Sequence, residues 1–471
     1  MQSLWKKEAS EPHALFIDCF ASVPKNFVEE VAIWLCGFRS EPKIISKNGE
    51  TRKRKANQPL PEIVPKRSSR ILEKQTNGIR QIYSKTERLR PKYEKRLQRF
   101  VPCLSYPPNK NYEDLANVLE VDTSKLFGRH IVANCDIDVG QIIGVAKPFS
   151  QIIYGSIDGN NNSSLPSNCL TCHKNNVTVQ CERCDDVMFC SEECRSANKI
   201  HKIECTSISH KISDQFYDVK LAIQMVLTTV KTFSSAYGMI NSFEKSNLAK
   251  NYTQHKWIML NLTKMERDNT ILRAYRAFEC LMTMDFITSR FNTDRSKRFL
   301  MHLVLHYTAI IPANAFIDNA GTKSIYGTLS FFNHSCAPNA CYGFKDGKGY
   351  IITIRPIKQD EQIFINYIGD KIKGSRVQRQ EHIKRHWEFE CKCERCAATA
   401  VIQPISFLID DPHYRYIQNN KKDRFLPFGC KKRNRLRDEC MNFLRKHGHC
   451  WTLVLDDVTI SFLLSHTDDS F

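Results

Sequence analysis

The amino-acid sequence predicts an α+β fold in which short strands are interrupted twice, first by a cysteine-rich segment and then by a helical one. Apolar and polar residues alternate over residues 125–155, as in strands that bury one face. From 213 to 309 the apolar residues recur every three or four positions, which predicts helices. Strand-like sequence returns from about 325 to 367. At 471 residues the chain is long enough to contain several structural units.

The sequence before the first strands predicts a basic, flexible segment. Residues 41–100 contain 18 Lys and Arg against 6 Glu and no Asp, so this window supplies +12 of the formal net charge of +19. It is also poor in apolar residues and contains Pro59, Pro61 and Pro65. Such a segment buries too little apolar surface to fold stably, and we expect most of it to be flexible.

Two basic groups in this segment have the spacing of a bipartite nuclear import signal. Arg52–Lys55 precede Lys66 and Arg67 by ten residues. The same charges could instead contact nucleic acid or acidic proteins without specificity. A short helical element is expected within 13–36, and the sequence assigns it no role.

Targeting and redox features favour the nucleus and cytoplasm. No window reaches the 18 or more apolar residues of a spanning helix, so no membrane association is expected. The first residues lack the apolar core of a signal peptide, so secretion is not expected. Many of the 20 cysteines are spaced as metal ligands rather than as disulfide partners, which indicates a reducing compartment.

Residues 169–205 contain eight ligand-type side chains in four closely spaced pairs. The gaps between partners are those with which thiolates and imidazoles converge on one tetrahedral zinc ion. Eight ligands make two closed zinc sites, and metal binding would provide the folding energy of so short a segment. The pairs are Cys169 with Cys172, Cys181 with Cys184, Cys190 with Cys194, and His201 with Cys205.

A second cysteine group near the carboxyl end is one ligand short of a closed site. The sequence WEFECKCERC provides Cys391, Cys393 and Cys396. A fourth ligand must come from elsewhere in the chain, and Cys336 in NHSCAPN is the candidate. The sequence therefore predicts three zinc ions in all.

Several of these motifs together resemble a known family. NHSCAPN at 333–339, DEQIFINY at 360–367 and the CKCERC cysteines are similar to the second half of a SET methyltransferase domain with its post-SET cysteines. GRHIVANCDIDVGQII from Gly128 resembles the first half, and residues 169–205 resemble a MYND zinc finger. In this order they resemble the SET-and-MYND protein lysine methyltransferases, most of all the arthropod-type members.

The resemblance implies a domain order along the chain. It implies a SET-domain β-fold split by a MYND finger and a helical insertion, and followed by a zinc-binding segment. The divisions are an N-terminal extension (1–110), the first SET half (111–168), the finger (169–205), the helical insertion (206–310), the second SET half (311–370), the post-SET segment (371–400) and a helical C-terminal region (401–471).

The resemblance also implies how the finger shares its ligands, because in that family the pairs interleave. One zinc site would then consist of Cys169, Cys172, Cys190 and Cys194. The other would consist of Cys181, Cys184, His201 and Cys205. Such fingers commonly bind proline-containing peptides of partner proteins.

The implied activity is S-adenosylmethionine-dependent protein-lysine N-methylation of histone or non-histone proteins. Tyr367 would be the catalytic residue, and its hydroxyl would orient the methyl group and the incoming nitrogen. Phe316 would line the lysine channel. The implied cofactor-binding residues are Gly128, Arg129, His130, Asn314, Asn333, His334, Tyr367 and Phe389, the last of which would cover the adenine.

This chemistry requires an in-line approach of a neutral amine to a methylsulfonium carbon. A free lysine has a pKa near 10.4, so the amine must lose its proton on entering an apolar channel beside a positive sulfur. Proximity and orientation would then supply most of the acceleration.

Two positions depart from the family pattern, and they leave a second function open. His130 stands where members have the second glycine of a Gly-x-Gly turn, and Ala146 where many have glutamate. The alternative is a catalytically weak or inactive adaptor that recruits protein partners in transcriptional regulation. Specific nucleic-acid binding ranks last, because eight closed ligands in this arrangement do not match base-reading fingers. A monomer is expected.

Overall fold

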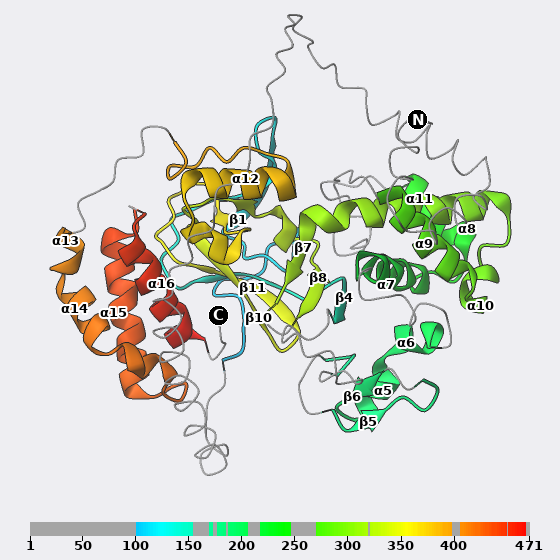
Figure 1. Ribbon diagram of the computed structural model, residues 1–471, viewed down its shortest axis with the longest axis horizontal. Helices are drawn as coiled ribbons and strands as arrows, with labels where there is room; N and C mark the ends of the chain where they lie inside the picture. The colour runs from blue at the N-terminus through cyan, green and yellow to red at the C-terminus, as the bar shows by residue number, and fades with distance from the viewer. Residues whose placement is uncertain are drawn as a thin grey trace, which may run out of the picture. The chain divides into compact units, whose positions relative to one another are not determined.

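The computed structural model describes residues 100–153, 169–172, 177–184, 187–205, 217–245, 270–318, 321–397, 406–449 and 451–467 (Figure 1). The chain divides into two compact units, Met1–Lys92 and Tyr93–Phe471, and the described residues belong to the second. The expected element at 13–36 and the import-signal residues lie outside the described residues. None of the described helices combines the length and apolarity of a membrane span.

The predicted α+β fold is confirmed, and its strands form several small sheets. Each described sheet has two or three strands, and the partners in most of them are antiparallel. The strands outside the cysteine-rich segment are β1 (Leu119–Ser124), β2 (Gly128–Ala133), β3 (Ile142–Ala146), β4 (Ser150–Ile153), β7 (Ala315–Ile317), β8 (Thr322–Ile325), β9 (Asn333–His334), β10 (Ala340–Lys345), β11 (Lys348–Thr353) and β12 (Phe364–Ile365).

Strands from the two ends of this region pair directly, although the finger and the helical insertion separate them in sequence. β3 pairs with β11, which also pairs with β10. β4 pairs with β8, which also pairs with β7. The β10–β11 hairpin closes through Asp346 and Gly347, which have φ angles of 48° and 72°. Two consecutive positive φ angles match the twist of the flanking strands, and Asp-Gly adopts them readily.

A close packing contact fixes the β10–β11 pair. Gly343 lies opposite Tyr350 in the register, and a side chain at 343 would collide with the Tyr350 ring. Tyr350 is fully buried. Glycine at 343 is therefore required by space, because its φ is not among the positive values of the described glycines.

Gly343→Ala is expected to lower the free energy of unfolding by about 2 kcal/mol, the cost of forcing an added methyl group into a packed core. Gly238→Ala is the matched control: that glycine lies in helix α8, and an added methyl would meet nothing closer than 3.4 Å. There the substitution should stabilise by roughly 0.5 kcal/mol. Urea unfolding of both variants measures the two changes in the free energy of unfolding. Equal changes would contradict the packing argument.

The segment between the strands is helical, as its periodicity predicted. Helix α7 buries Val219, Ile223, Val226, Leu227 and Val230, and Thr229 of this helix hydrogen-bonds Tyr307 Oη at 2.6 Å. Phe216, expected on the same face, lies outside the described residues. The helices are α7 (Tyr217–Lys231), α8 (Ala236–Lys245), α9 (Thr270–Met282), α10 (Asp285–Thr288) and α11 (Asp294–Asn314).

The strands resume earlier than the sequence predicted. We expected them from about Ile325, but β7 begins at Ala315, directly after α11. Pro312 lies inside the last turn of α11, and the apolar run IIPANAF continues across the boundary, so the sequence does not mark the exact end of the helix. Pairing of β7 with β8 decides it, through a turn in which Gly321 has a φ of 73°.

The C-terminal region is a group of helices that packs on the β10–β11–β3 sheet. Ile142, Tyr350 and Ile352 of that sheet share one apolar core with Phe443 and Phe462 from the helices. The sequence RLRDECMNFLRKH lies in the longest described helix of this region, α15, which begins at Lys431. The elements of the region are α13 (Ser406–Ile409), α14 (Pro412–Asn419), η5 (Lys421–Phe425), α15 (Lys431–His447) and α16 (Leu453–His466), and η4 (Gly369–Lys373) and α12 (Arg376–Trp387) precede it.

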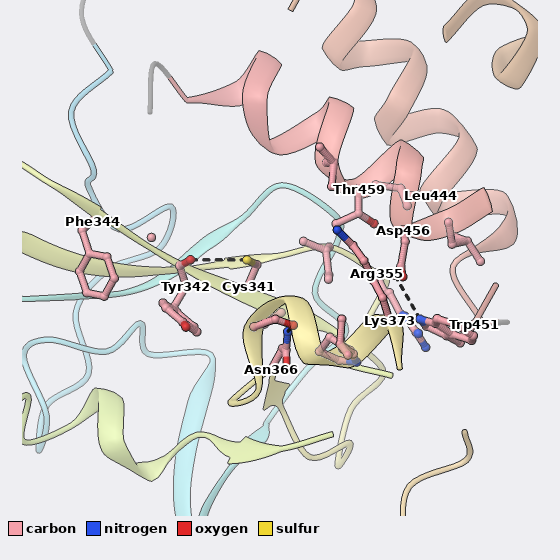
Figure 2. Close-up of a pocket in the computed structure, with 18 of the residues that line it drawn as sticks. Cys341, Tyr342, Phe344, Arg355, Asn366, Lys373, Leu444, Trp451, Asp456 and Thr459 are labelled. Carbon is pink, nitrogen blue, oxygen red and sulfur yellow. Dashed lines mark hydrogen bonds between the residues drawn. The ribbon is translucent and has the colours of Figure 1, made fainter. Parts of the chain in front are cut away.

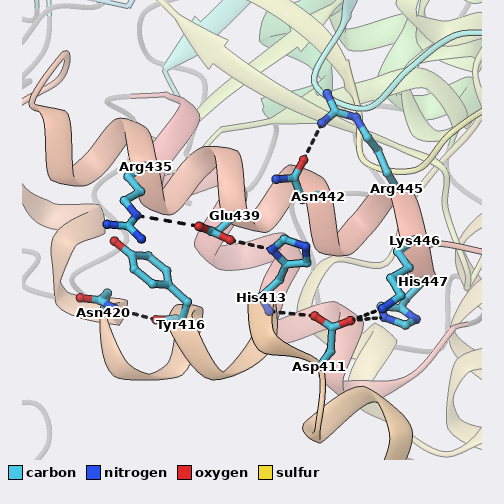
Figure 3. Close-up of polar contacts among 10 residues, drawn as sticks. All are labelled: Asp411, His413, Tyr416, Asn420, Arg435, Glu439, Asn442, Arg445, Lys446 and His447. Atoms are coloured by element: carbon cyan, nitrogen blue, oxygen red, sulfur yellow. Dashed lines mark hydrogen bonds and ion pairs between the residues drawn. The ribbon is translucent and has the colours of Figure 1, made fainter.

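Asp411 joins two of these helices through a buried carboxylate (Figure 3). It caps α14 by accepting the His413 N–H at 2.8 Å, and from α15 it accepts Lys446 Nζ at 2.8 Å and His447 Nε2 at 2.9 Å. Burial alone would raise the pKa of Asp411, but these hydrogen bonds outweigh it and hold the pKa well below its usual range. The charged carboxylate is therefore the stabilising form.

Asp411→Ala should lower the free energy of unfolding by about 3 kcal/mol at pH 7, because it removes a helix cap and two charge-assisted hydrogen bonds. Since the folded pKa lies below the unfolded value of about 3.9, this stabilisation is complete above about pH 4 and fades as the pH falls further. Urea unfolding should show that the difference in the free energy of unfolding between wild type and Asp411→Ala is smaller at pH 3 than at pH 7.

Asp410→Ala is the control for this pair, because the Asp410 side chain is 72% exposed and its ion pair with Arg415 lies at the surface. Its effect should stay within about 0.5 kcal/mol. The role of the charged carboxylate would be refuted if the free energies of unfolding of wild type and Asp411→Ala differed by the same amount at pH 7 and pH 3.

Candidate active site and metal centres

The structure brings the eight finger ligands together in two interleaved groups. Cys169, Cys172, Cys190 and Cys194 form one, and Cys181, Cys184, His201 and Cys205 form the other. Within each group the ligand atoms lie within 4.8 Å of one another. Strands β5 (Val179–Gln180) and β6 (Met188–Phe189) and the short helices α5 (Glu192–Ala197) and α6 (Lys199–Glu204) carry or flank these ligands.

The donor geometry of both finger groups fits zinc. Cys190 Sγ lies 3.4 Å from Cys172 Sγ and 3.5 Å from Cys194 Sγ, and Cys181 Sγ lies 3.5 Å from Cys205 Sγ. A tetrahedron with Zn–S bonds of about 2.3 Å has edges of roughly 3.8 Å. Cysteine ligands that lie three or four positions apart in the sequence thus have sulfur atoms at nearly the separations that a zinc tetrahedron requires.

Local hydrogen bonds prepare one of these thiols for ionisation. Burial by itself would raise the pKa of Cys169, but the N–H groups of Cys172, Cys190 and Thr171 hold it at about 7, below its ordinary value. The thiolate, which is the form that binds metal, is therefore accessible near neutral pH.

A third group consists of Cys336, Cys391, Cys393 and Cys396, again with all ligand atoms within 4.8 Å. We call it the third cysteine cluster. Cys336 Sγ lies 3.9 Å from Cys391 Sγ and 3.6 Å from Cys396 Sγ. The neighbouring Cys336 and Cys391 thiols lower the pKa of Cys396 to about 6. The donor set and its geometry fit a third zinc ion.

Helix α12 supports the third cysteine cluster with two polar side chains. Gln380 donates to the Cys391 carbonyl at 2.6 Å and accepts the Cys391 N–H at 3.0 Å. The buried Arg379 donates to Gly374 O at 2.7 Å and contacts Cys396 Sγ at 3.5 Å. Its positive charge offsets the negative charge of the thiolates.

Metal analysis of the purified chain should find three zinc ions, and Cys336→Ser should lower the count to two, because the finger groups share no ligand with the third cysteine cluster. Cys341→Ser is the matched control, since that cysteine lies outside all three groups among the described residues. It should retain three ions. A wild-type count of two, or no loss in Cys336→Ser, would exclude Cys336 as a ligand.

The motif NHSCAPN forms a parallel crossing with the strand before Tyr367. β9 pairs in parallel with β12, and the pairing continues where Ser335 N–H donates to Ile365 O at 3.1 Å. His334 is buried, and its Nδ1 accepts the Tyr367 N–H at 3.0 Å. Burial lowers the pKa of His334 to about 4, so the imidazole is neutral at pH 7 and can act as this acceptor.

The Tyr367 hydroxyl lies at this crossing. It donates to the Phe332 carbonyl at 2.7 Å, one residue before Asn333. Burial raises the pKa of Tyr367 above its ordinary value, so the phenol stays protonated. Its ring packs beside His334 and Trp387, each with ring centroids 5.4 Å away. The hydroxyl oxygen is thus fixed by one hydrogen bond and two aromatic contacts.

Asn339, to which the sequence assigned no role, holds the NHSCAPN loop through its side chain. Its Oδ1 accepts the Phe364 N–H at 2.7 Å, and its Nδ2 donates to Gln362 O at 3.0 Å. It is 4% exposed. Its two partners lie 23 and 25 residues further along the chain. The local sequence therefore shows only the residue type, and asparagine is also favoured in turns.

The β1–β2 hairpin reaches the same crossing. Asn333 Nδ2 donates to Phe127 O at 3.1 Å, which places the first-half motif beside the second-half motif. Gly128 has a φ of 62°, the conformation that glycine adopts at least cost. The Arg129 guanidinium lies over the Phe331 ring at 5.1 Å.

The two departures from the family pattern occupy ordinary strand positions. His130 lies in β2 opposite Asp122, with Nε2 3.5 Å from the carboxylate and Nδ1 3.0 Å from Gly128 O. It is not among the described residues with positive φ, so a side chain there causes no backbone strain. Ala146 ends β3 as a buried residue opposite Gly349.

The remaining predicted residues lie around this core. Asn314 is buried at the end of α11, where its Nδ2 donates to Ile310 O at 2.7 Å. Phe389 is 37% exposed, with its ring centroid 6.2 Å from that of His334. Phe316 in β7 packs edge-on against Tyr326 and Tyr342, at centroid distances of 5.5 and 5.4 Å. An aromatic group therefore surrounds Phe316.

A cavity of about 500 Å³ extends from this aromatic group to the C-terminal helices (Figure 2). At one end Tyr342 and Phe344 of β10 line it, and Asn366, the neighbour of Tyr367, also contributes. At the other end, which we call the polar end, charged and polar side chains join apolar ones such as Leu444 and Leu455. Figure 2 shows Arg355, Lys373, Trp451 and Asp456 gathered there beside α16.

The SET domain family matches residues 128–368, just over half of the chain. The chain belongs to the SET domain family. This range covers both halves of the β-region, the crossing and Tyr367, and it encloses the cysteine-rich finger.

Among curated proteins, histone-lysine N-methyltransferase ASHR1 of Arabidopsis thaliana is 23% identical over 286 residues, covering 57% of this chain and 53% of that protein. A SET and MYND domain-containing protein of Dictyostelium discoideum is 23% identical over 342 residues, covering 60% and 81%. SET domain and MYND-type zinc finger protein 6 of Schizosaccharomyces pombe is 24% identical over 272 residues, covering 57% and 50%. The chain thus spans about half the length of the first and third of these relatives.

Proposed function

We propose that this chain is an S-adenosylmethionine-dependent protein-lysine N-methyltransferase acting on histone or non-histone proteins. The observation that carries the proposal is the Tyr367 hydroxyl of a partly buried side chain, held by the Phe332 carbonyl at the crossing of β9 and β12. Membership of the SET domain family supports it, and so does the name of the Arabidopsis relative.

The residues at the crossing fit the proposed cofactor. When bound, S-adenosylmethionine supplies an electrophilic methyl group on a positive sulfur. Asn333 and His334 would hold it partly through backbone groups, and the half-exposed Phe389 ring offers an apolar face for its adenine. Gly128, Arg129 and His130 directly follow Phe127, whose carbonyl accepts a hydrogen bond from Asn333. We infer that Asn314 contributes from the end of α11.

The chain's own contribution to the chemistry is orientation and desolvation. The Tyr367 proton is committed to the Phe332 carbonyl, so the phenol oxygen can orient the methyl group and the incoming amine through its lone pairs. Phe316, Tyr342 and Phe344 would surround the substrate side chain with apolar rings. Burial among them disfavours the ammonium form, and loss of that proton leaves the nitrogen lone pair for in-line attack.

Tyr367→Phe should reduce methyl transfer from labelled cofactor to a protein panel by roughly 100-fold, the effect of losing one oriented polar group. Cofactor affinity, measured by calorimetric titration, should stay within about twofold, because the ring and the crossing remain. Tyr237→Phe, at a side chain that is 68% exposed, is the matched control and should transfer normally.

The same experiment separates the adaptor from the enzyme. Cofactor binding with no transfer to any protein would favour a MYND and SET adaptor that recruits partners in transcriptional regulation. A wild-type chain that does not bind the cofactor would refute the enzyme proposal.

We also propose the partners and the location that follow from this function. The finger would bind proline-containing peptides, and the protein substrate would present its lysine at the aromatic end of the cavity. The chain would act as a monomer in nucleus and cytoplasm without specific nucleic-acid binding. The basic groups at 52–55 and 66–67 support nuclear entry.

A further inference from the structure

The polar end of the cavity is built from parts that lie far apart in sequence. Arg355 follows β11, Lys373 ends η4, and Trp451 and Asp456 belong to the C-terminal segment. Trp451 Nε1 donates to Asp456 Oδ1 at 3.1 Å, which fixes the indole against the first turn of α16. This wall has to be held at a defined distance from the SET strands if the cavity is to keep one shape.

One side chain of the third cysteine cluster reaches this wall. Arg395 lies between the ligands Cys393 and Cys396, and its Nη1 donates to the Cys336 carbonyl at 3.2 Å. The same guanidinium lies over the Trp451 ring, with its central carbon 3.2 Å from the ring centroid. A planar cation over an indole face is the most favourable form of this contact. Arg395 thus joins the cluster to the cavity wall.

A second contact runs in parallel from the neighbouring residue. Glu394 Oε1 accepts Arg355 Nη1 at 3.0 Å, and the Arg355 side chain, which lines the cavity, is only 12% exposed. The loop that carries Cys393 and Cys396 therefore contacts the polar end of the cavity from two consecutive residues. The cysteine ligands and the α12 side chains Arg379 and Gln380 together hold this loop in place.

The carboxylate of Asp456 shows how much the wall depends on Arg395. Asp456 Oδ2 is buried and has no hydrogen-bond partner among the described residues. Burial raises the pKa of Asp456, and the positive charge of Arg395 is the largest opposing influence. Without Arg395 this carboxylate would keep its hydrogen bond from Trp451 and lose its largest compensating charge, with Arg355 and Lys373 as the remaining cations, and this favours movement of the segment toward water.

We propose that Arg395 is a positioning residue that sets the shape of the polar end of the cavity by fixing Trp451 and Asp456 to the third cysteine cluster. It thereby determines the affinity for the protein substrate and leaves the chemistry at Tyr367 unchanged. The step from cavity shape to substrate affinity rests on the proposed methyltransferase function. The step from Arg395 to the position of Trp451 does not.

The central variant is Arg395→Gln, with Arg415→Gln as the control at an arginine that is 65% exposed. Acrylamide quenching of tryptophan fluorescence, compared with the same variants carrying Trp451→Phe, isolates the signal of Trp451. In Arg395→Gln the quenching constant of Trp451 should rise about twofold, because the guanidinium no longer covers the ring. The three zinc ions should be retained, which shows that the cluster itself is intact.

Arg395→Lys and Cys336→Ser distinguish positioning from general damage. The lysine variant keeps the charge but lacks the planar fork, so it should restore the quenching in part. Cys336→Ser should also expose Trp451, and the double variant with Arg395→Gln should show no further increase, since both changes break one connection. The proposal would be overturned if the two changes raised the quenching of Trp451 additively in the double variant. It would also be overturned if Arg395→Gln left the quenching of Trp451 unchanged.

Kinetics test the consequence for the substrate. At saturating cofactor, Arg395→Gln should raise KM for the protein substrate about tenfold while kcat and cofactor affinity stay within about twofold. A joint fall of kcat and cofactor affinity would overturn the positioning role, because it would place the effect at the crossing. If the wild type transfers no methyl group, the proposed function fails, and the quenching series still decides the role of Arg395.

Discussion

The architecture of the site depends on the attachment of Cys336 to three cysteines more than fifty residues further along the chain. Cys336 is fully buried, and it lies in the same short loop as Asn333 and His334. One shared metal site therefore fixes two things at once, the loop at the crossing and the segment that carries Phe389. Metal coordination suits this task because the contacting segments are too short to bury a core of their own.

Around this attachment the polar side chains work mainly as structural hydrogen-bond partners. His334 stays neutral and accepts the Tyr367 N–H, while Asn339 fastens the loop to the strand that leads to Tyr367. The Tyr367 hydroxyl is in turn held by the Phe332 carbonyl. A site that positions reactants, and uses no covalent intermediate, needs this kind of preorganisation more than it needs reactive groups.

The C-terminal helices complete the molecule on the other side of the cavity. Their apolar faces join the core of the β10–β11–β3 sheet, and Asp411 joins α14 to α15. Arg395 brings the third cysteine cluster into contact with the same region at Trp451. The cavity thus lies between strand β10 and the C-terminal helices, and the third cysteine cluster contacts one end of it through Arg395 and Trp451.

The sequence by itself determined the α+β class, the helical insertion and the finger ligands, because periodicity and ligand pairs act over a few neighbouring residues. The motifs also pointed to Cys336 and Tyr367. Only the tertiary structure decided that β7 starts at Ala315, that Asn339 anchors the loop, and that Arg395 reaches Trp451. These depend on contacts between residues far apart in the chain, and such contacts leave no regular spacing in the sequence.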